Sequence, residues 1–192
     1  AAKLGLECEF IKDFFQHDAY LEAVTEVSKP YFANDYDCVV MSYHGLPERH
    51  LRKLDKGGKH CLQSKSCCDA VSTVNRNCYK AQCYATSRAL AKQLNIPSEK
   101  YVVAFQSRLG KDPWIKPDTD TYYQLLAEQG MKSVLVLCPS FVADCLETLE
   151  EIEMRGNEEF QQFGGEKLTL VPSLNSREHW VKAVGKILNL QF

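Results

Sequence analysis

Residues 39–50 read VVMSYHGLPERH, and this stretch decides how the fold is interpreted. The apolar run at its start has the length of a buried strand, and we expect that strand over about residues 37–43. His44 follows at once, and a glycine and a proline then favour a turn. A titratable imidazole at the end of a buried strand suits a metal ligand or a proton acceptor, although a turn histidine bonded to the backbone is the alternative.

Three further apolar runs resemble the first, at about residues 100–106, 132–138 and 167–172. Such continuous Val/Leu runs are typical of parallel strands covered on both faces. Amphipathic helical patterns alternate with them, at residues 18–32, 79–94, 119–130, 144–160 and 176–188. The alternation predicts an α/β fold, a four-stranded parallel sheet with helices on both faces, as one Rossmann-like domain over residues 1–192.

Composition excludes several classes of protein. The formal net charge is -2 and no basic block occurs, so we expect no nucleic-acid partner. No apolar run approaches the roughly 20 residues that span a bilayer. The N-terminus has early acids and is not a signal peptide, so a cytoplasmic location is expected. Because no Met leads the chain, we interpret it as a piece of a longer protein.

The ends of the expected strands should form one site. Ligands of open parallel sheets bind outside the carboxyl ends of the strands. His44 lies at such an end, and residues 106–108, 139–141 and 173–175 follow the other three strands. We therefore expect these segments to converge at one edge of the sheet.

The helical pattern after the third strand carries a line of acids. Glu147 and Glu151 are one turn apart, so their carboxylates should lie on one face, where a divalent cation or a proton would relieve their repulsion. Stabilisation of acids near a helix N-terminus is the alternative explanation. Leu146, Leu149 and Ile152 are expected to form an apolar stripe along the same helix. Imidazole and carboxylates together suit first-row divalent metals.

Three motifs in order carry a specific resemblance: SYHGLPER, FQSRLGKDPWIKPDTDTYYQLLAEQG and SFVADCLETLEEIE. Over about residues 36–175 the chain resembles ferrochelatases, which insert ferrous iron into a porphyrin. Members of the family have two such domains with the porphyrin between them, so the resemblance implies a C-terminal half. The missing N-terminal half is then a partner, and the isolated half is expected to be inactive. Peripheral membrane contact and the choice between protoporphyrin IX and coproporphyrin III stay open.

The resemblance also implies roles for single residues. His44 corresponds to the histidine that accepts porphyrin protons or binds iron, Glu147 to its acidic partner, and Glu151 to the next acid along a locally widened helix. Four residues correspond to the stretch that lines the substrate cleft: Gln106, Ser107, Arg108 and Trp114.

Two positions depart from the pattern of the family. Cys145 stands where a histidine is frequent, and its softer thiolate puts the metal preference in doubt, so a cobalt or nickel chelatase remains an alternative. Arg155 stands where a third acid of the line is usual. A cation there should repel a metal, so the metal route is expected to end at Glu151 or to turn aside.

Residues 51–78 show neither the hydrophobic period of a helix nor that of a strand, and they are expected to form a cysteine-rich insertion. Unpaired thiols, structural zinc and a [2Fe-2S] cluster are the alternatives, and the spacings lack the C-x-x-C of a zinc ribbon. Some bacterial ferrochelatases that this segment resembles carry a [2Fe-2S] cluster there. The expected ligands are Cys61, Cys68, Cys78 and Cys83, with Cys67 as the alternate; His60 could replace one thiolate. A second hypothesis is therefore an iron-sulfur or zinc binding module without catalysis of its own.

Overall fold

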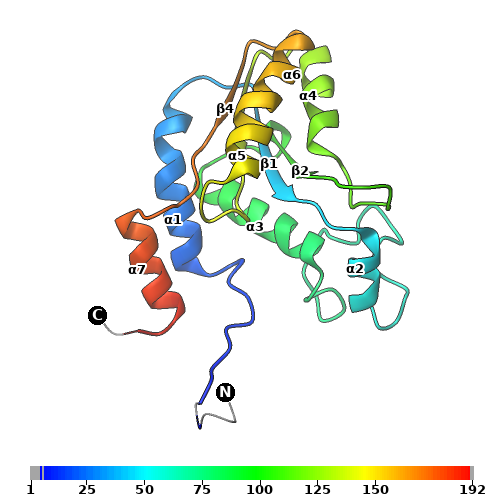
Figure 1. Ribbon diagram of the computed structural model, residues 1–192, viewed down its shortest axis with the longest axis vertical. Helices are drawn as coiled ribbons and strands as arrows, with labels where there is room; N and C mark the ends of the chain where they lie inside the picture. The colour runs from blue at the N-terminus through cyan, green and yellow to red at the C-terminus, as the bar shows by residue number, and fades with distance from the viewer. Residues whose placement is uncertain (1–4, 6, 191–192) are drawn as a thin grey trace.

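A computed structural model of the chain describes residue 5 and residues 7–190 (Figure 1). Its sheet is parallel throughout, in the order β2-β1-β3-β4. The strands are β1 (Cys38–His44), β2 (Tyr101–Gln106), β3 (Ser133–Leu137) and β4 (Lys167–Leu170). The predicted fold class is confirmed, and the strand ends differ from the expected ones by one or two residues. The last strand ends at Leu170, two residues before its expected end, although the Val171 N–H still donates to the Val136 oxygen at 2.8 Å.

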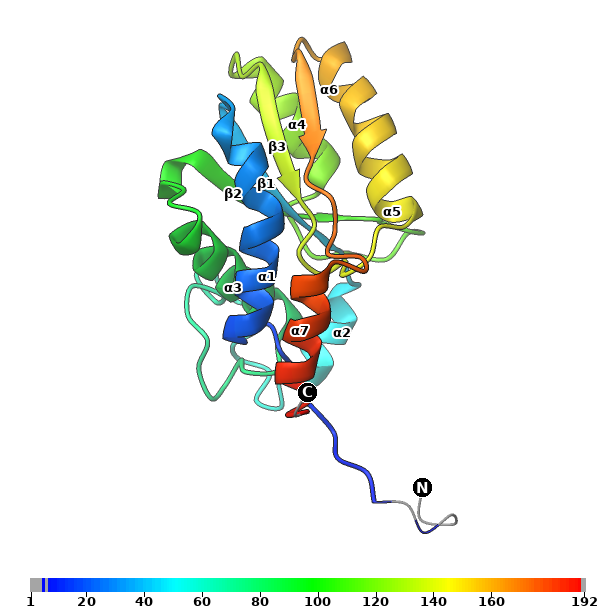
Figure 2. The ribbon, with the colours of Figure 1, turned by 90° about the vertical axis from the view of Figure 1, so that its left-hand side faces the viewer.

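Helices cover both faces of the sheet (Figure 2). One face packs against α1 (Asp18–Ser28), α3 (Tyr79–Gln93) and α7 (Glu178–Ile187). The other packs against α4 (Thr119–Glu128), α5 (Leu146–Thr148), the π-helix η4 (Leu149–Gly156) and α6 (Asn157–Gln162). Shorter elements are η2 (Lys29–Ala33), α2 (Glu48–Leu54) and η3 (Ser98–Lys100). No helix in the described part of the chain is long and apolar enough to cross a membrane.

The central strand explains the sequence pattern. Side chains of β1 alternate between two apolar cores: Met41 and Tyr43 face α1 and α3, and Val40 faces α4. Val40 and Met41 are 0% exposed. Burial of each such side chain contributes about 1.5–3 kcal/mol, and it leaves no polar face along the strand.

The expected insertion over residues 51–78 stays a prediction, and most of it is irregular. Residues 51–54 form the end of α2, and residues 55–78 then run without helix or strand until α3 begins. The Asp55 carboxylate accepts backbone hydrogen bonds from the N–H groups of Gly58, His60 and Cys61. The segment is therefore held by polar side chains rather than by a regular ladder.

Candidate active site at the carboxyl edge of the sheet

His44 is the last residue of β1 and is half-buried. The centroid of its ring lies 6.3 Å from that of Trp114 and 6.2 Å from that of Phe141. Its Nδ1 is 2.6 Å from the carbonyl oxygen of Gly45. Because a carbonyl oxygen only accepts, Nδ1 carries the hydrogen, and the neutral ring keeps the lone pair of Nε2 for a proton or a metal.

Gly45 brings Trp114 against this histidine. A Cβ at position 45 would lie 2.9 Å from the Gln106 carbonyl oxygen and 3.0 Å from Cε3 of Trp114, so a side chain does not fit. The Gly45 N–H donates to that same oxygen at 2.8 Å, and the Ile115 N–H donates to the Leu46 oxygen at 3.0 Å. The turn after β1 is thereby tied to the loop that carries Trp114.

Glu147 lies in the first turn of α5. The pKa of its carboxyl is lowered, first by a hydrogen bond from the Cys145 thiol, then by its own backbone N–H, and also by attraction to His44. Gln106 Nε2 donates to the backbone oxygen of Glu147 at 2.5 Å. Since Gln106 pairs with His44 in the sheet register, the structure brings the imidazole and the glutamate to one edge.

Gln106 itself points inward, with 3% exposure. Its Oε1 accepts from Ser42 Oγ at 2.7 Å and lies 3.5 Å from the Cys138 thiol. It therefore joins β1, β3 and α5, a supporting place that the sequence pattern did not reveal. The substrate contact expected of Gln106 stays a prediction.

Ser107 binds the side chain of Glu151, the second acid of the predicted line. Its N–H and hydroxyl donate to the two carboxylate oxygens of Glu151, at 2.7 and 2.5 Å. Ser107 adopts a φ of 64°, a left-handed conformation that costs a non-glycine residue about 1–2 kcal/mol. Strain of this kind clusters at functional sites. The sequence analysis expected Ser107 only in the substrate cleft and missed this contact.

The expected apolar stripe of this helix is only partly buried. Ile152 is buried, but Leu146 is 77% exposed and Leu149 is 44% exposed. The helix is locally widened, as the resemblance implied: η4 is a π-helix with i→i+5 hydrogen bonds, and Leu146 precedes it in α5. Leu109, whose backbone oxygen accepts from Trp114, is a third exposed leucine, at 81%. Exposed apolar patches with polar rims are typical of binding surfaces.

The remaining residues predicted for substrate binding line this open edge. Arg108 is exposed directly after the strained Ser107. Trp114 is half-buried, and its Nε1 donates to the Leu109 oxygen at 3.0 Å. Phe141, which the sequence analysis placed only within a converging segment, is the second aromatic neighbour of His44.

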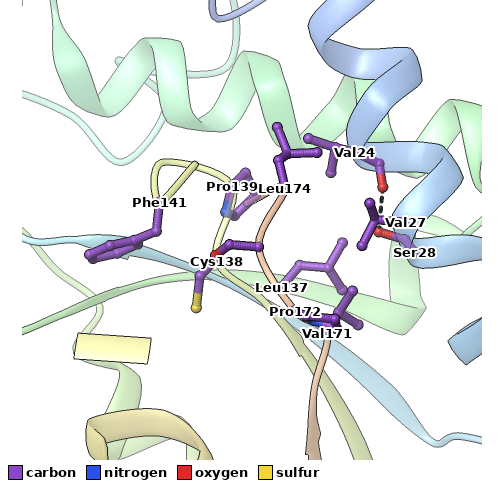
Figure 3. A pocket seen from close by; sticks show the side chains of 11 residues that line it. Val24, Val27, Ser28, Leu137, Cys138, Pro139, Phe141, Val171, Pro172 and Leu174 are labelled. Carbon is purple, nitrogen blue, oxygen red and sulfur yellow. Dashed lines mark hydrogen bonds between the residues drawn. The ribbon is translucent and has the colours of Figure 1, made fainter. Parts of the chain in front are cut away.

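A small crevice behind Phe141 does not extend the site (Figure 3). It measures about 20 Å³ and is lined by apolar side chains such as Val24, Leu137 and Leu174. Ser28 beside it donates its hydroxyl hydrogen to the Val24 oxygen at 2.7 Å. Since a cavity of this size admits about one water molecule, an organic ligand would bind on the open edge instead.

The cysteines of the irregular segment gather around Cys78, which precedes α3. Cys61, Cys68 and Cys78 are buried, with 3–4% exposure. The Cys68 and Cys61 thiols donate to Cys78, and so do backbone amides at the start of α3; these bonds lower the pKa of Cys78. Cys67 Sγ lies 3.6 Å from Cys68 Sγ. The structure therefore groups Cys61, Cys67, Cys68 and Cys78.

Cys83 lies apart from this contact network. Its thiol is hydrogen bonded to the Tyr79 side chain, and burial raises its pKa. It lines a cavity of about 230 Å³ between α1, β1 and α3. Within residue 5 and residues 7–190, no three His, Cys, Asp or Glu side chains are arranged as ligands of one metal ion. The expected choice of Cys83 over Cys67 stays a prediction, and the observed contacts favour Cys67.

His60 is already engaged in this segment. Its Nε2 lies 3.0 Å from the Cys67 carbonyl oxygen, so that nitrogen carries the hydrogen and donates it. The lone pair of Nδ1 stays available, so His60 could replace a thiolate ligand without losing this hydrogen bond.

Known proteins match the chain over its length. A family model described as Ferrochelatase matches residues 1–191. A ferrochelatase of Pseudomonas fluorescens (strain SBW25) is 47% identical over 186 residues, which cover 96% of this chain and 54% of that protein. A ferrochelatase of Pseudomonas putida (strain KT2440) is 49% identical over 184 residues, with 95% and 54% coverage. The chain thus spans about half the length of the curated relatives it matches.

Proposed function

The chain belongs to the ferrochelatase family, and from this we propose that it is the C-terminal half of an enzyme that inserts ferrous iron into a porphyrin. One observation carries the proposal: His44 and Glu147 both meet Gln106 at the carboxyl edge of the sheet, His44 as its strand partner and Glu147 through its backbone oxygen. Neither is buried in a dry core, so both are accessible to a substrate at this edge.

His44 is the proposed proton acceptor. Metal insertion requires the porphyrin to lose two pyrrole N–H protons, and an imidazole accepts protons near neutral pH. The hydrogen bond from Nδ1 to the Gly45 oxygen leaves Nε2 as the accepting atom. The rings of Trp114 and Phe141 restrict the rotation of the imidazole, which keeps Nε2 in one place.

Glu147 is the proposed receiving group for the ferrous ion. Its carboxyl stays ionised at neutral pH because its pKa is lowered. It is anchored through its backbone oxygen, so the carboxylate oxygens can turn toward an incoming cation. Glu151, held by Ser107, is the proposed next acid for metal or protons.

We place the porphyrin on the exposed apolar surface around Leu109, Leu146 and Leu149, with Trp114 at its edge. A planar apolar macrocycle is matched by such a surface, and Arg108 would pair with one of its carboxylates. The N-terminal half of the enzyme would cover the opposite face. We propose a cytoplasmic protein with peripheral membrane contact, and an inactive chain when this half is alone.

The test uses the full-length enzyme and measures insertion of ferrous iron into protoporphyrin IX and coproporphyrin III. We expect His44→Ala and Glu147→Gln to lower kcat at least 100-fold, the usual loss when a proton-transfer group is removed. His50→Ala is the matched control, since His50 is an exposed histidine on α2. Wild-type turnover in the His44 and Glu147 variants would refute the proposal.

A second candidate function is specific to residues 55–78: we propose that they hold a [2Fe-2S] cluster. The grouping of four cysteines around Cys78 supports it, because such a cluster takes four thiolates and Cys78 is already biased toward the thiolate. The ligands would be Cys61, Cys68 and Cys78 with Cys67 or Cys83. When bound, the group would supply a redox-active centre. Asp55 and the buried Asn75, which donates to the Cys67 oxygen, would keep the segment in place.

Purification without oxygen tests this candidate. We expect a coloured protein with two irons and two labile sulfides per chain, and Cys78→Ser should remove the colour. Cys8→Ser is the control, because Cys8 is exposed and lies outside the segment. Separate Cys67→Ser and Cys83→Ser variants decide the fourth ligand. A colourless wild-type protein without iron would refute the cluster, and one equivalent of zinc would favour structural zinc instead.

A further inference from the structure

The cavity of about 230 Å³ between α1, β1 and α3 is a second place where a ligand fits. Ser140 lines it, and the Ser140 hydroxyl accepts the His44 N–H at 3.4 Å, so the cavity adjoins the end of β1. Its walls are mainly aromatic, and five ring-bearing residues line it: Phe14, Phe15, Tyr20, Tyr43 and Tyr79. Walls of this kind with a few polar groups are typical of sites for small organic molecules.

The polar ends of two of these tyrosines already have partners. The Tyr20 hydroxyl donates to the Pro139 oxygen at 2.5 Å, and the Tyr43 hydroxyl lies 2.8 Å from the Ser87 hydroxyl. A ligand in the cavity would therefore meet these residues through their rings. The ring centroids of Phe14 and Tyr20 are 5.4 Å apart and the ring planes stand at 74°, so the two rings form a corner. Aromatic rings attract cations to their faces, because the face carries the negative part of the ring quadrupole.

Asp13 supplies a negative charge to this cavity. The residue is half-buried, and its Oδ2 atom is buried without a hydrogen-bond partner within the described residues. Such an oxygen favours a donor, because burial without a hydrogen bond is costly for a polar atom. Two neutral side chains of the wall already donate to backbone oxygens, Gln82 to Arg76 at 2.9 Å and Thr86 to Phe15 at 2.8 Å. The lining residues, which all lie in the described part of the chain, include no lysine, arginine or histidine.

We propose that this cavity binds a primary alkylammonium ion, with its N–H groups hydrogen bonded to Asp13 Oδ2 and its alkyl chain between the aromatic rings. An ammonium group carries three donors, whereas a quaternary ammonium has none to offer the carboxylate. A neutral alcohol would leave the charge of the carboxylate uncompensated. The cavity is smaller than the roughly 300–1,000 Å³ of sites for drug-sized molecules, so it suits a short chain and excludes a macrocycle. None of the residues proposed for iron insertion lines it, so the two proposals stand separately.

The experiment titrates the full-length enzyme with n-butylammonium chloride at pH 7, where an alkylamine carries its proton, and measures the dissociation constant by saturation-transfer NMR. We expect one saturable site. Asp13→Asn should weaken binding at least about ten-fold, because a hydrogen bond to a charged group is lost. Phe14→Leu keeps an apolar side chain without a ring face and should weaken binding about two- to five-fold. Asp35→Asn is the matched control, because Asp35 is exposed and lies outside the cavity.

n-Butanol tests the charge with the wild-type enzyme alone. It has the same chain without the ammonium group, and it should bind at least about ten-fold more weakly. The inference fails when butylammonium shows no saturable binding, or when butanol binds as tightly. It also fails when folded Asp13→Asn or Phe14→Leu enzyme, checked by circular dichroism, binds butylammonium as tightly as Asp35→Asn does. Should Asp13→Asn unfold, the comparison of butylammonium with butanol decides.

Discussion

Gly45→Ala tests how the turn after β1 controls the site. The new Cβ would lie 2.9 Å from the Gln106 carbonyl oxygen and 3.0 Å from Cε3 of Trp114. Since non-bonded carbons pack best at about 3.5–4.0 Å, these neighbours must retreat by about 0.5–1 Å. The oxygen belongs to β2 and accepts the Gly45 N–H, so we expect the Trp114 ring to move.

The expected cost of this overpacking is about 1–3 kcal/mol in the free energy of unfolding, measured by urea denaturation. Because Trp114 lies beside the His44 ring, kcat for iron insertion should fall as well, and the tryptophan fluorescence should shift. Gly57→Ala is the matched control: its Cβ would meet only Asp55 Oδ1 at 3.7 Å, so stability should change by less than about 0.5 kcal/mol. Unchanged stability and turnover in Gly45→Ala would refute this account of the turn.

Two further predictions concern groups that hold the acidic helix. Asp144 accepts hydrogen bonds from Asn175 Nδ2, from the Ser173 N–H and from the Thr148 hydroxyl, at 2.7, 3.1 and 3.2 Å, and these bonds lower its pKa below 3.8 against the opposing effect of burial. A carboxyl whose pKa is lower in the folded state stabilises the protein at a pH above its unfolded-state pKa, and this stabilisation is lost as the pH falls through the folded-state pKa. Asp144→Asn should therefore lower the free energy of unfolding by about 1 kcal/mol at pH 7 and leave it unchanged well below pH 3.8, as measured by denaturation curves. An equal loss at both pH values would contradict this linkage. Ser107→Ala removes the hydroxyl that binds Glu151 and should lower the free energy of unfolding by about 1.5–3 kcal/mol, whereas Ser176→Ala, at an exposed serine, should have little effect. Equal effects of the two variants would rule out the Ser107 contact as a stabilising one.

The sheet was predictable from the sequence because its strands are buried on both faces. Residues such as Val40 and Met41 leave no polar alternation, and that continuous pattern identifies a parallel strand. His44 could be placed for the same reason, since the end of the run fixes the end of the strand. The position of the site therefore follows from hydrophobic burial alone.

The side-chain contacts were not predictable, for identifiable reasons. The spacing of Leu146, Leu149 and Ile152 does not show which of them is buried, and the widened helix was expected from the resemblance rather than from any local pattern. The burial of the Gln106 side chain was not predictable either, because a side chain at the end of a strand can turn toward the core or toward the solvent. The grouping of Cys67 with Cys68 arises in an irregular segment, where no period relates sequence spacing to distance.

Gln106, at the end of β2, and Ser107, directly after it, bind different groups of the two acids Glu147 and Glu151. Gln106 binds the backbone oxygen of Glu147 and leaves its carboxylate uncommitted, whereas Ser107 binds both carboxylate oxygens of Glu151. Hydrogen bonds to a charged group contribute about 1.5–3 kcal/mol each, so a cation that moves to Glu151 must first compete with the two from Ser107. A cation at Glu147 meets no such competition beyond one thiol and its own backbone N–H. Glu147 is therefore the acid expected to exchange metal with the substrate, and Glu151 the one that keeps the helix against the sheet.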